Sequence, residues 1–189
     1  MTLLLLMAWG TMNVSLSSMA EQSKPVNALS SEKQSGESNA PSIPAVGKAD
    51  GTLTVNGKTV PIRFAYARRI KGRFDATKQE FDLILTDKPL PAVELKSLRE
   101  LRDSFHTPMT SIRNVKAQGV YLYLDSEGKI RTRAPYHEAL DGTSIAEMTS
   151  ENEGFKIEKE SITGKTKHDG EDFGQKWRYS ISFHASLKE

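Results

Sequence analysis

The chain has 189 residues, a formal net charge of +2 and no cysteine. Because the charge is nearly balanced, no strong field favours nucleic acid or an anionic membrane surface, and nucleic acid is not an expected partner. Without cysteine there is no disulfide, no zinc–thiolate site and no thiol nucleophile. A domain of the expected size buries about two thirds of its unfolded surface, so its core alone can stabilise it.

The first 20 residues have the pattern of a secretory signal peptide. An apolar run over residues 3–9 is followed by Ser18-Met19-Ala20, which has small residues at its first and third positions. The run is shorter than the about 20 apolar residues that span a bilayer. We therefore expect a signal peptide at 1–20 and no integral membrane span after its cleavage. Because no lysine or arginine precedes the run, an uncleaved anchor and a buried first strand are the alternatives.

The next segment, residues 21–48, is rich in Ser, Asn, Glu, Lys, Gln, Pro and Ala and has no sustained hydrophobic period. Such a composition buries too little apolar surface to offset the entropy lost on ordering. It predicts a disordered linker, and residues 49–189 then form a single β-rich domain. The protein is thus expected outside the cytoplasm, in the periplasm or secreted.

Within this domain, alternating apolar residues predict several short strands. Residues 51–66 predict a hairpin, because Asn56-Gly57 tolerates the positive φ angles of a tight turn. Residues 120–124 are apolar on both faces and predict a central strand. The alternation over residues 177–185 is the longest in the chain and predicts the last strand.

One helix is predicted at about residues 92–105, where apolar residues recur at spacings of three and four, and Pro108 is expected to stop it. Residues 162–167 predict a strand, and the polar segment 168–174 is expected to be the loop before the last strand. About seven to nine strands predict a mainly β fold, an antiparallel β-sandwich or barrel. The helix would cover one end or one open face.

Three stretches carry a resemblance to a known group. They are Gly-Thr-Leu-Thr-Val-Asn-Gly-Lys at 51–58, Ala-Tyr-Ala-Arg at 65–68 and Leu-Thr-Asp-Lys-Pro-Leu-Pro at 85–91. Together they resemble a loosely defined group of exported bacterial β-rich proteins without an assigned function. The resemblance covers roughly the first third of the domain. It implies an exported β domain and supplies no catalytic residue.

Tyr66, Arg68 and Arg69 form the first candidate binding site. Two guanidinium groups beside a tyrosine, at the end of a strand, can bind a carboxylate or a phosphate through paired hydrogen bonds. The alternative is an edge strand that its positive charge protects against pairing with another chain. No residue is expected to be catalytic, because the chain has neither a nucleophile motif nor a glycine-rich phosphate loop.

Tyr136 and His137 form the second candidate binding site. The four histidines lack the short spacings of metal motifs, so no metal and no other cofactor is expected; they are His106, His137, His168 and His184. His168 is expected in an exposed acidic loop with residues 169–172, the alternative being a calcium loop whose ligand pattern is incomplete. Asp82 lies in a predicted strand and alternates away from its apolar residues, so it is expected on a solvated face.

These features predict an exported, non-enzymatic binding or structural module of the cell envelope or periplasm, with an envelope protein or a small ligand as its partner. One alternative is a small-ligand carrier with a β-barrel cavity lined by aromatic side chains; these are Tyr66, Tyr121, Tyr123, Trp177 and Tyr179. A third possibility is a hydrolase that uses Asp or Glu together with His, which requires two titratable groups within reach of each other in a cleft.

Overall fold

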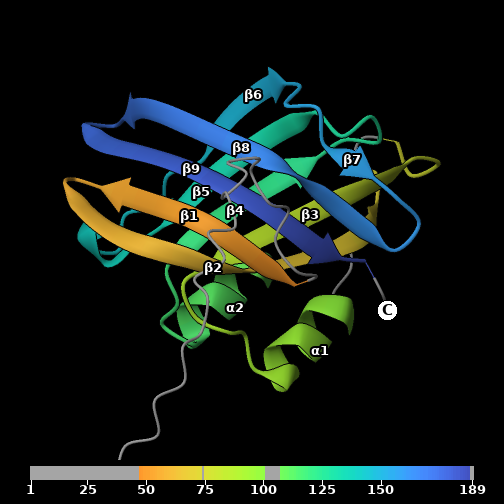
Figure 1. The fold of residues 1–189 in the computed structure, drawn as a ribbon, viewed down its shortest axis with the longest axis horizontal. Coiled ribbons are helices and arrows are strands. Elements are labelled where there is room, and N and C mark those ends of the chain that lie inside the picture. Colours follow the sequence, from red (N-terminus) through yellow and green to blue (C-terminus); the bar gives the residue numbers. More distant parts are fainter. Residues whose placement is uncertain (1–46, 74, 101–106, 188–189) are drawn as a thin grey trace, which may run out of the picture. The chain divides into compact units, whose positions relative to one another are not determined.

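The computed structural model describes residues 47–73, 75–100 and 107–187. The predicted signal peptide and the predicted linker up to residue 46 lie outside the described residues. What the structure describes is the β-rich domain, whose first strand begins at Lys48. The fold is mainly β, as the sequence predicts, and it is an antiparallel sheet curled into a half-barrel (Figure 1).

Nine strands of the described chain form this sheet, in the order β6-β5-β4-β3-β2-β1-β9-β8-β7. The strands are β1 (Lys48–Val55), β2 (Lys58–Lys71), β3 (Gln79–Thr86), β4 (Gly119–Leu124), β5 (Ile130–Tyr136), β6 (Glu147–Glu151), β7 (Lys156–Ile157), β8 (Ser161–Asp172) and β9 (Gln175–Ser186). The helical segments are α1 (Ala92–Glu100), α2 (Thr107–Asn114) and a 3-10 turn, η1 (Glu138–Leu140).

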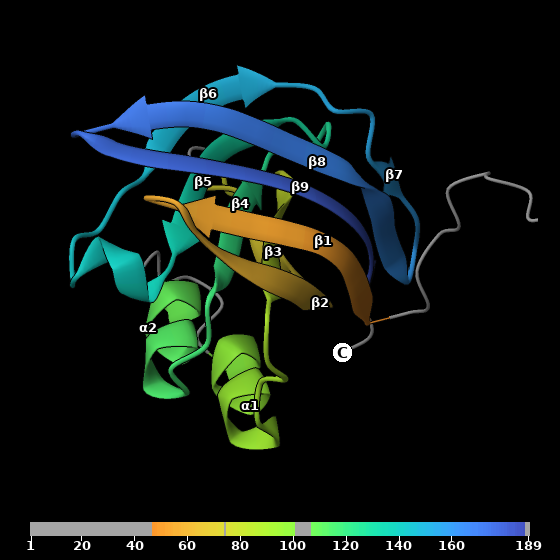
Figure 2. The ribbon, with the colours of Figure 1, turned by 60° about the vertical axis from the view of Figure 1, so that its left-hand side comes forward.

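The sheet has an apolar cluster on each side. The larger one fills the inner side of the curl, with residues such as Leu53, Leu122 and Phe183 fully buried. The smaller one lies on the outer side, where Ile84 and Tyr121 pack with apolar residues of the helices. Both helices lie on this side (Figure 2). Strand β4 is buried at every position between β3 and β5, which confirms the predicted central strand.

Two tight hairpins fix the pairing of the strands. The predicted β1–β2 turn is confirmed, with positive φ angles of 49° at Asn56 and 81° at Gly57. A second turn of this kind joins β8 to β9, with φ of 50° at Phe173 and 74° at Gly174. Phenylalanine is not a usual turn residue, so the sequence predicts the loop in the polar residues that precede it. The predicted loop at 168–174 is therefore wrong over residues 168–172, which belong to strand β8.

The helical region also differs in detail from the sequence prediction. Helix α1 begins at Ala92 as expected, while residues 101–106 lie outside the described residues. A second helix, α2, follows at Thr107–Asn114 and was not predicted. Pro108 lies in its first turn, where the missing backbone N–H costs nothing, so this proline opens a helix and does not merely end one.

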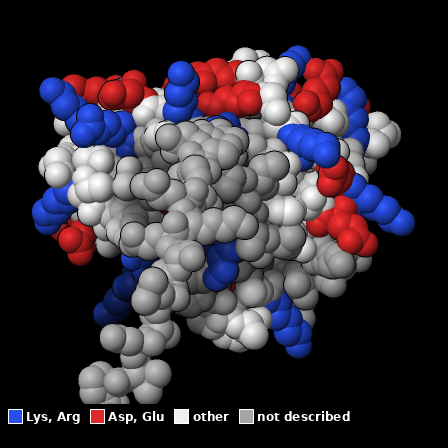
Figure 3. Space-filling model, in the orientation of Figure 1, with Lys and Arg blue, Asp and Glu red and all other residues white. Residues whose placement is uncertain are grey.

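The charged side chains of the described residues are mixed in sign. On the face that Figure 3 shows, lysine and arginine of the described residues lie beside aspartate and glutamate. Among the described residues, no helix is long and apolar enough to cross a membrane. The features that set one part of the domain apart from another are therefore local clusters, and two of these contain a buried histidine.

Candidate functional site

The first predicted site, Tyr66, Arg68 and Arg69, lies inside the sheet. Over these residues strand β2 pairs with β3 on one side, and on the other side it pairs with β9 at Tyr66. The Arg68 guanidinium holds Asp82 through two contacts, Nε to Oδ2 at 2.7 Å and Nη2 to Oδ2 at 2.6 Å. The Tyr66 hydroxyl accepts a hydrogen bond from the Leu90 backbone N–H at 3.0 Å.

Arg69 also contacts the chain itself. Its guanidinium donates to the backbone carbonyls of Glu158, Lys159 and Leu187, the first at 3.3 Å and the last at 3.5 Å. It thereby ties the segment before β8 to the end of β9. The structure thus places the groups of the first predicted site among internal partners, where they stabilise the fold.

Asp82 is the centre of this internal network. Its side chain is fully buried, and the Tyr121 hydroxyl donates to Oδ1 at 2.6 Å. Arg73 Nη2 lies 3.4 Å from the same oxygen and donates to the Tyr121 hydroxyl at 2.8 Å. The prediction of a solvated face for Asp82 is wrong, because the outer side of β3 is the side on which the helices pack. A buried carboxylate then requires paired cations and donors.

The second predicted site, Tyr136 and His137, lies in a groove. Strand β5 ends at Tyr136, and His137 is the N-cap of η1. The groove has a volume of about 490 Å³, and α2 and η1 both contribute to its walls. Three exposed cationic side chains also line it, those of Lys88, Arg113 and Lys116. Arg113 lies over the Tyr136 ring, 5.6 Å from its centroid.

His137 is held in one orientation within this groove. Its Nδ1 accepts a hydrogen bond from the Ala139 backbone N–H at 3.0 Å, so the neutral ring carries its proton on Nε2. The residue is 7% exposed, and Nε2 is buried without a hydrogen-bond partner among the described residues. Burial lowers the pKa of His137, although Glu138 and Asp87 oppose this. The lining of the groove thus contains His137, whose Nε2 has no partner among the described residues, together with three cations.

A second, largely buried histidine lies on the inner side of the curl. His168 is on strand β8, its side chain is 10% exposed, and its Nε2 has no hydrogen-bond partner among the described residues. Arg133 of β5, with a side chain only 1% exposed, donates from Nη1 to His168 Nδ1 at 3.0 Å. Residues 35 positions apart therefore meet on the inner side of the curl.

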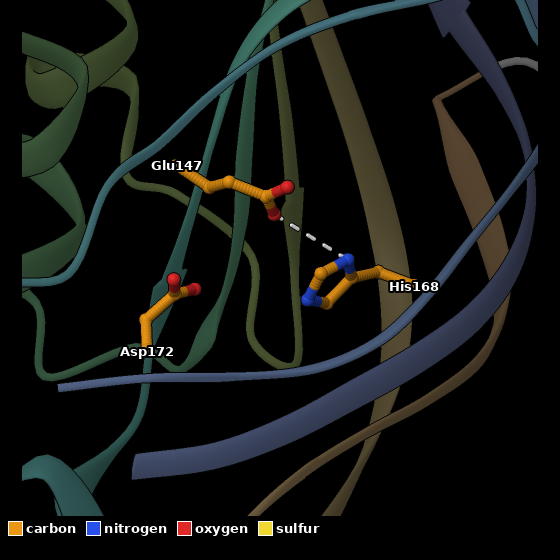
Figure 4. A group of neighbouring side chains, drawn as sticks. All are labelled: Glu147, His168 and Asp172. Carbon is orange, nitrogen blue, oxygen red and sulfur yellow. Dashed lines mark ion pairs between the residues drawn. The ribbon is translucent and has the colours of Figure 1, made fainter. Parts of the chain in front are cut away.

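Carboxylates surround this pair. Glu147 Oε2 lies 3.6 Å from Arg133 Nε and 3.5 Å from His168 Nδ1. Glu151 Oε2 is 2.6 Å from Arg133 Nη2, and this hydrogen-bonded contact lowers the pKa of Glu151. Asp172, at the end of β8, is close enough that its oxygen, a Glu147 oxygen and a His168 nitrogen lie within 4.8 Å of one another (Figure 4).

Aromatic residues fix the position of this cluster. The His168 ring lies tilted against the Trp177 ring, with centroids 4.0 Å apart, and Trp177 Nε1 donates to Asp172 Oδ2 at 3.0 Å. Burial lowers the pKa of His168, and the neighbouring Glu147 opposes this shift. The sequence contained a signal for this arrangement: His168 continues the inward alternation of β8, paired with Tyr179 of β9.

The comparisons with known proteins give no match. No protein-family model matches the chain, and no curated protein and no solved structure is significantly similar to it. No relative therefore assigns a role to any of its residues.

Proposed function

We propose that this chain is an exported, non-enzymatic binding module of the cell envelope or periplasm, and that its ligand presents an oxyanion to the groove of Tyr136 and His137. The proposal rests on the signal-like first 20 residues and the polar linker for the location. It rests on one observation for the site, the buried Nε2 donor of His137 beside three cations.

The chemistry of the groove favours an anion. A buried N–H without a partner costs free energy that an oxyanion acceptor would recover. Hydrogen bonds from charged donors to a carboxylate, phosphate or sulfate are about twice as strong as neutral ones. Glu138 is the one carboxylate among the described lining residues. Its Oε1 lies 3.9 Å from Nζ of Lys58, a residue that is not part of the lining. The net charge of the lining is therefore positive.

The carrier alternative receives less support from the placement of the aromatic side chains. Trp177 and Tyr179 lie in the inner cluster, while Tyr121 and Tyr123 lie in the outer one, with Tyr66 packed against it. These rings therefore do not line one shared cavity. The hydrolase alternative needs a histidine beside carboxylates, an arrangement that the His168 cluster offers.

The site is tested by titrating the full, isotope-labelled chain with sodium sulfate at constant ionic strength. Sulfate is a suitable probe because its charge is constant from about pH 5 to about pH 8. We expect saturable NMR shifts of the His137 ring and the Ala139 amide, with a Kd of about 1 mM. Acetate and phosphate titrations then show which oxyanion geometry binds more tightly.

The variant His137→Asn tests the Nε2 donor while the hydrogen bond to the Ala139 backbone is kept. Its side-chain oxygen can replace Nδ1 as the acceptor for Ala139, while the Nε2 donor is lost. We expect at least about a tenfold weaker sulfate affinity, and His168→Asn serves as the matched control with unchanged affinity. Equal shifts with sulfate and chloride would refute the site.

The location is tested separately. Expression of the full chain in a Gram-negative host, followed by intact mass of the periplasmic fraction, should give a protein that begins at Glu21. An unprocessed chain confined to the cytoplasm would contradict export and would leave the sulfate result unaffected.

A further inference from the structure

The cluster around His168 is an independent site, because its charge is opposite to that of the groove. Within it, Arg133 pairs with two carboxylates, Glu151 at 2.6 Å and Glu147 at 3.6 Å. One arginine therefore lies among three carboxylates, those of Glu147, Glu151 and Asp172. A divalent cation would balance the remaining negative charge of these partly buried carboxylates.

From this geometry we propose that His168, Glu147 and Asp172 bind one divalent transition-metal ion, with Zn²⁺ as the best fit. The three ligand atoms lie within 4.8 Å of one another, so a cation placed equally between them is at most about 2.8 Å from each. Zinc bonds to nitrogen and oxygen are about 2.0–2.2 Å, so each side chain has to move inward by less than about 1 Å.

Two further observations point to a ligand at this place. First, the buried His168 Nε2 is unpartnered among the described residues and belongs to a side chain that is nine-tenths buried. Second, Gly170 places no side chain beside that nitrogen: a Cβ at this position would lie 2.8 Å from Nε2. Any larger residue at this position would therefore crowd Nε2. Figure 4 shows the Asp172 carboxylate on the Nε2 side of the ring.

The surroundings orient the ligands. Trp177 Nε1 holds one Asp172 oxygen at 3.0 Å, and the other oxygen stays available to a metal. Such hydrogen bonds from outside the ligand set fix the direction of a carboxylate ligand. Glu147 is partly exposed, with 29% of its side chain accessible, so water can complete the coordination. Three protein ligands and an open position are the usual arrangement of reactive zinc sites.

Metal binding changes the tautomer of His168. Arg133 Nη1 can only donate, so in the metal-free chain Nδ1 accepts and the ring proton is on Nε2. Coordination through Nε2 requires this proton to leave and Nδ1 to take one up, with no net proton exchanged. The Nδ1–H then faces Arg133 Nη1, which is also a donor, so this 3.0 Å contact is lost, while Arg133 keeps its contact with Glu151.

The ligand set also defines the selectivity. One imidazole nitrogen with two carboxylates suits Zn²⁺ or Mn²⁺, whereas Ca²⁺ and Mg²⁺ prefer sites made of oxygen alone. We therefore expect the affinity order Zn²⁺, then Mn²⁺, then Ca²⁺.

The test uses the full chain without a histidine tag, freed of metal with a chelator. Trp177 reports directly on the site, and Trp9→Phe removes the only other tryptophan of the chain. Zinc chloride is titrated by Trp177 fluorescence and by calorimetry. We expect one Zn²⁺ per chain, and a swap of the two nitrogen NMR signals of the His168 ring, which a purely structural histidine would not show.

Three variants decide the result. His168→Asn keeps an acceptor for Arg133 and loses Nε2, while Asp172→Asn keeps an acceptor for Trp177; each should weaken Zn²⁺ binding at least about 100-fold. His137→Asn is the matched control and should bind Zn²⁺ as the parent does. Should His168→Asn not fold, as judged by circular dichroism, Asp172→Asn gives the answer. A parent Kd weaker than about 0.1 mM, or equal affinities in parent and variants, would overturn the proposal.

Discussion

His137 and His168 share almost every local property and differ in their neighbours. Both are largely buried, both have an Nδ1 that accepts a hydrogen bond, and in both Nε2 has no hydrogen-bond partner among the described residues. His137 shares its groove with Lys88, Arg113 and Lys116, whereas His168 lies among carboxylates. The same donor therefore favours an anion in one place, while the same ring nitrogen favours a cation in the other.

The comparison shows that a histidine's environment decides its chemistry. A neutral imidazole is both a donor and a metal ligand, and the surrounding charge selects between these roles. The two arginines of these regions differ in the same way. Arg133 is buried and paired with carboxylates, and Arg113 is exposed and hydrogen-bonded to the Ser144 hydroxyl at 2.7 Å.

The largest expected difference between the regions is in their arginines. Arg133→Met leaves Glu147 and Glu151 without a cation and should lower the free energy of unfolding by about 3–5 kcal/mol. Arg113→Met removes an exposed cation and should cost less than about 1 kcal/mol. Urea denaturation of both variants measures this. Similar losses in the two variants would show that the regions do not differ in their electrostatic role.

A smaller effect is expected at Gly170. Gly170→Ala places a Cβ 2.8 Å from His168 Nε2, so the ring must move, at a cost of about 1–3 kcal/mol. Zinc affinity should fall together with stability. Gly164→Ala is the matched control on the same strand, because its Cβ would meet the Phe155 ring at 2.5 Å. If both variants weaken Zn²⁺ binding equally, the effect is general and not located at His168.

In the groove, a single surface cation should have a modest effect. Lys116→Ala removes one exposed charge from the lining and should weaken sulfate binding about two- to fivefold, with a smaller effect at high salt. The NMR titration measures it, and zinc affinity should not change. A loss of zinc binding in this variant would mean that the two regions are coupled.

The smallest expected effect is the pH dependence of stability through His137. Because burial lowers its pKa in the folded chain, the unfolded chain binds the proton more readily. The stability from the neutral ring is therefore complete above about pH 6.5, the unfolded value, and is lost as the pH falls through the folded value. Denaturation measured from about pH 8 to about pH 5 should show the free energy of unfolding falling together with the pH, and His137→Asn should reduce this slope. An unchanged slope in the variant would assign the pH dependence to other groups.

The sequence alone predicted the strands whose residues alternate and the turn whose residues tolerate positive φ. Asn56-Gly57 and strand β9 are of this kind, because local sterics and a period of two do not depend on the rest of the chain. Strand β4, apolar on both faces, was likewise predicted to be central. The turn at Phe173-Gly174 was not predicted, because only one of its two residues is a usual turn former, although both have positive φ angles.

Tertiary structure alone decided what each polar side chain meets. Asp82 could be placed on the correct side of its strand, yet only the packing of the helices on that side made it a buried partner of Arg68. His168 met Glu147 and Arg133 because the sheet curls and brings β5, β6 and β8 together. Periodicity gives the direction of a side chain, whereas burial and charge depend on residues far away in the sequence, and these determine whether a histidine binds an anion or a metal.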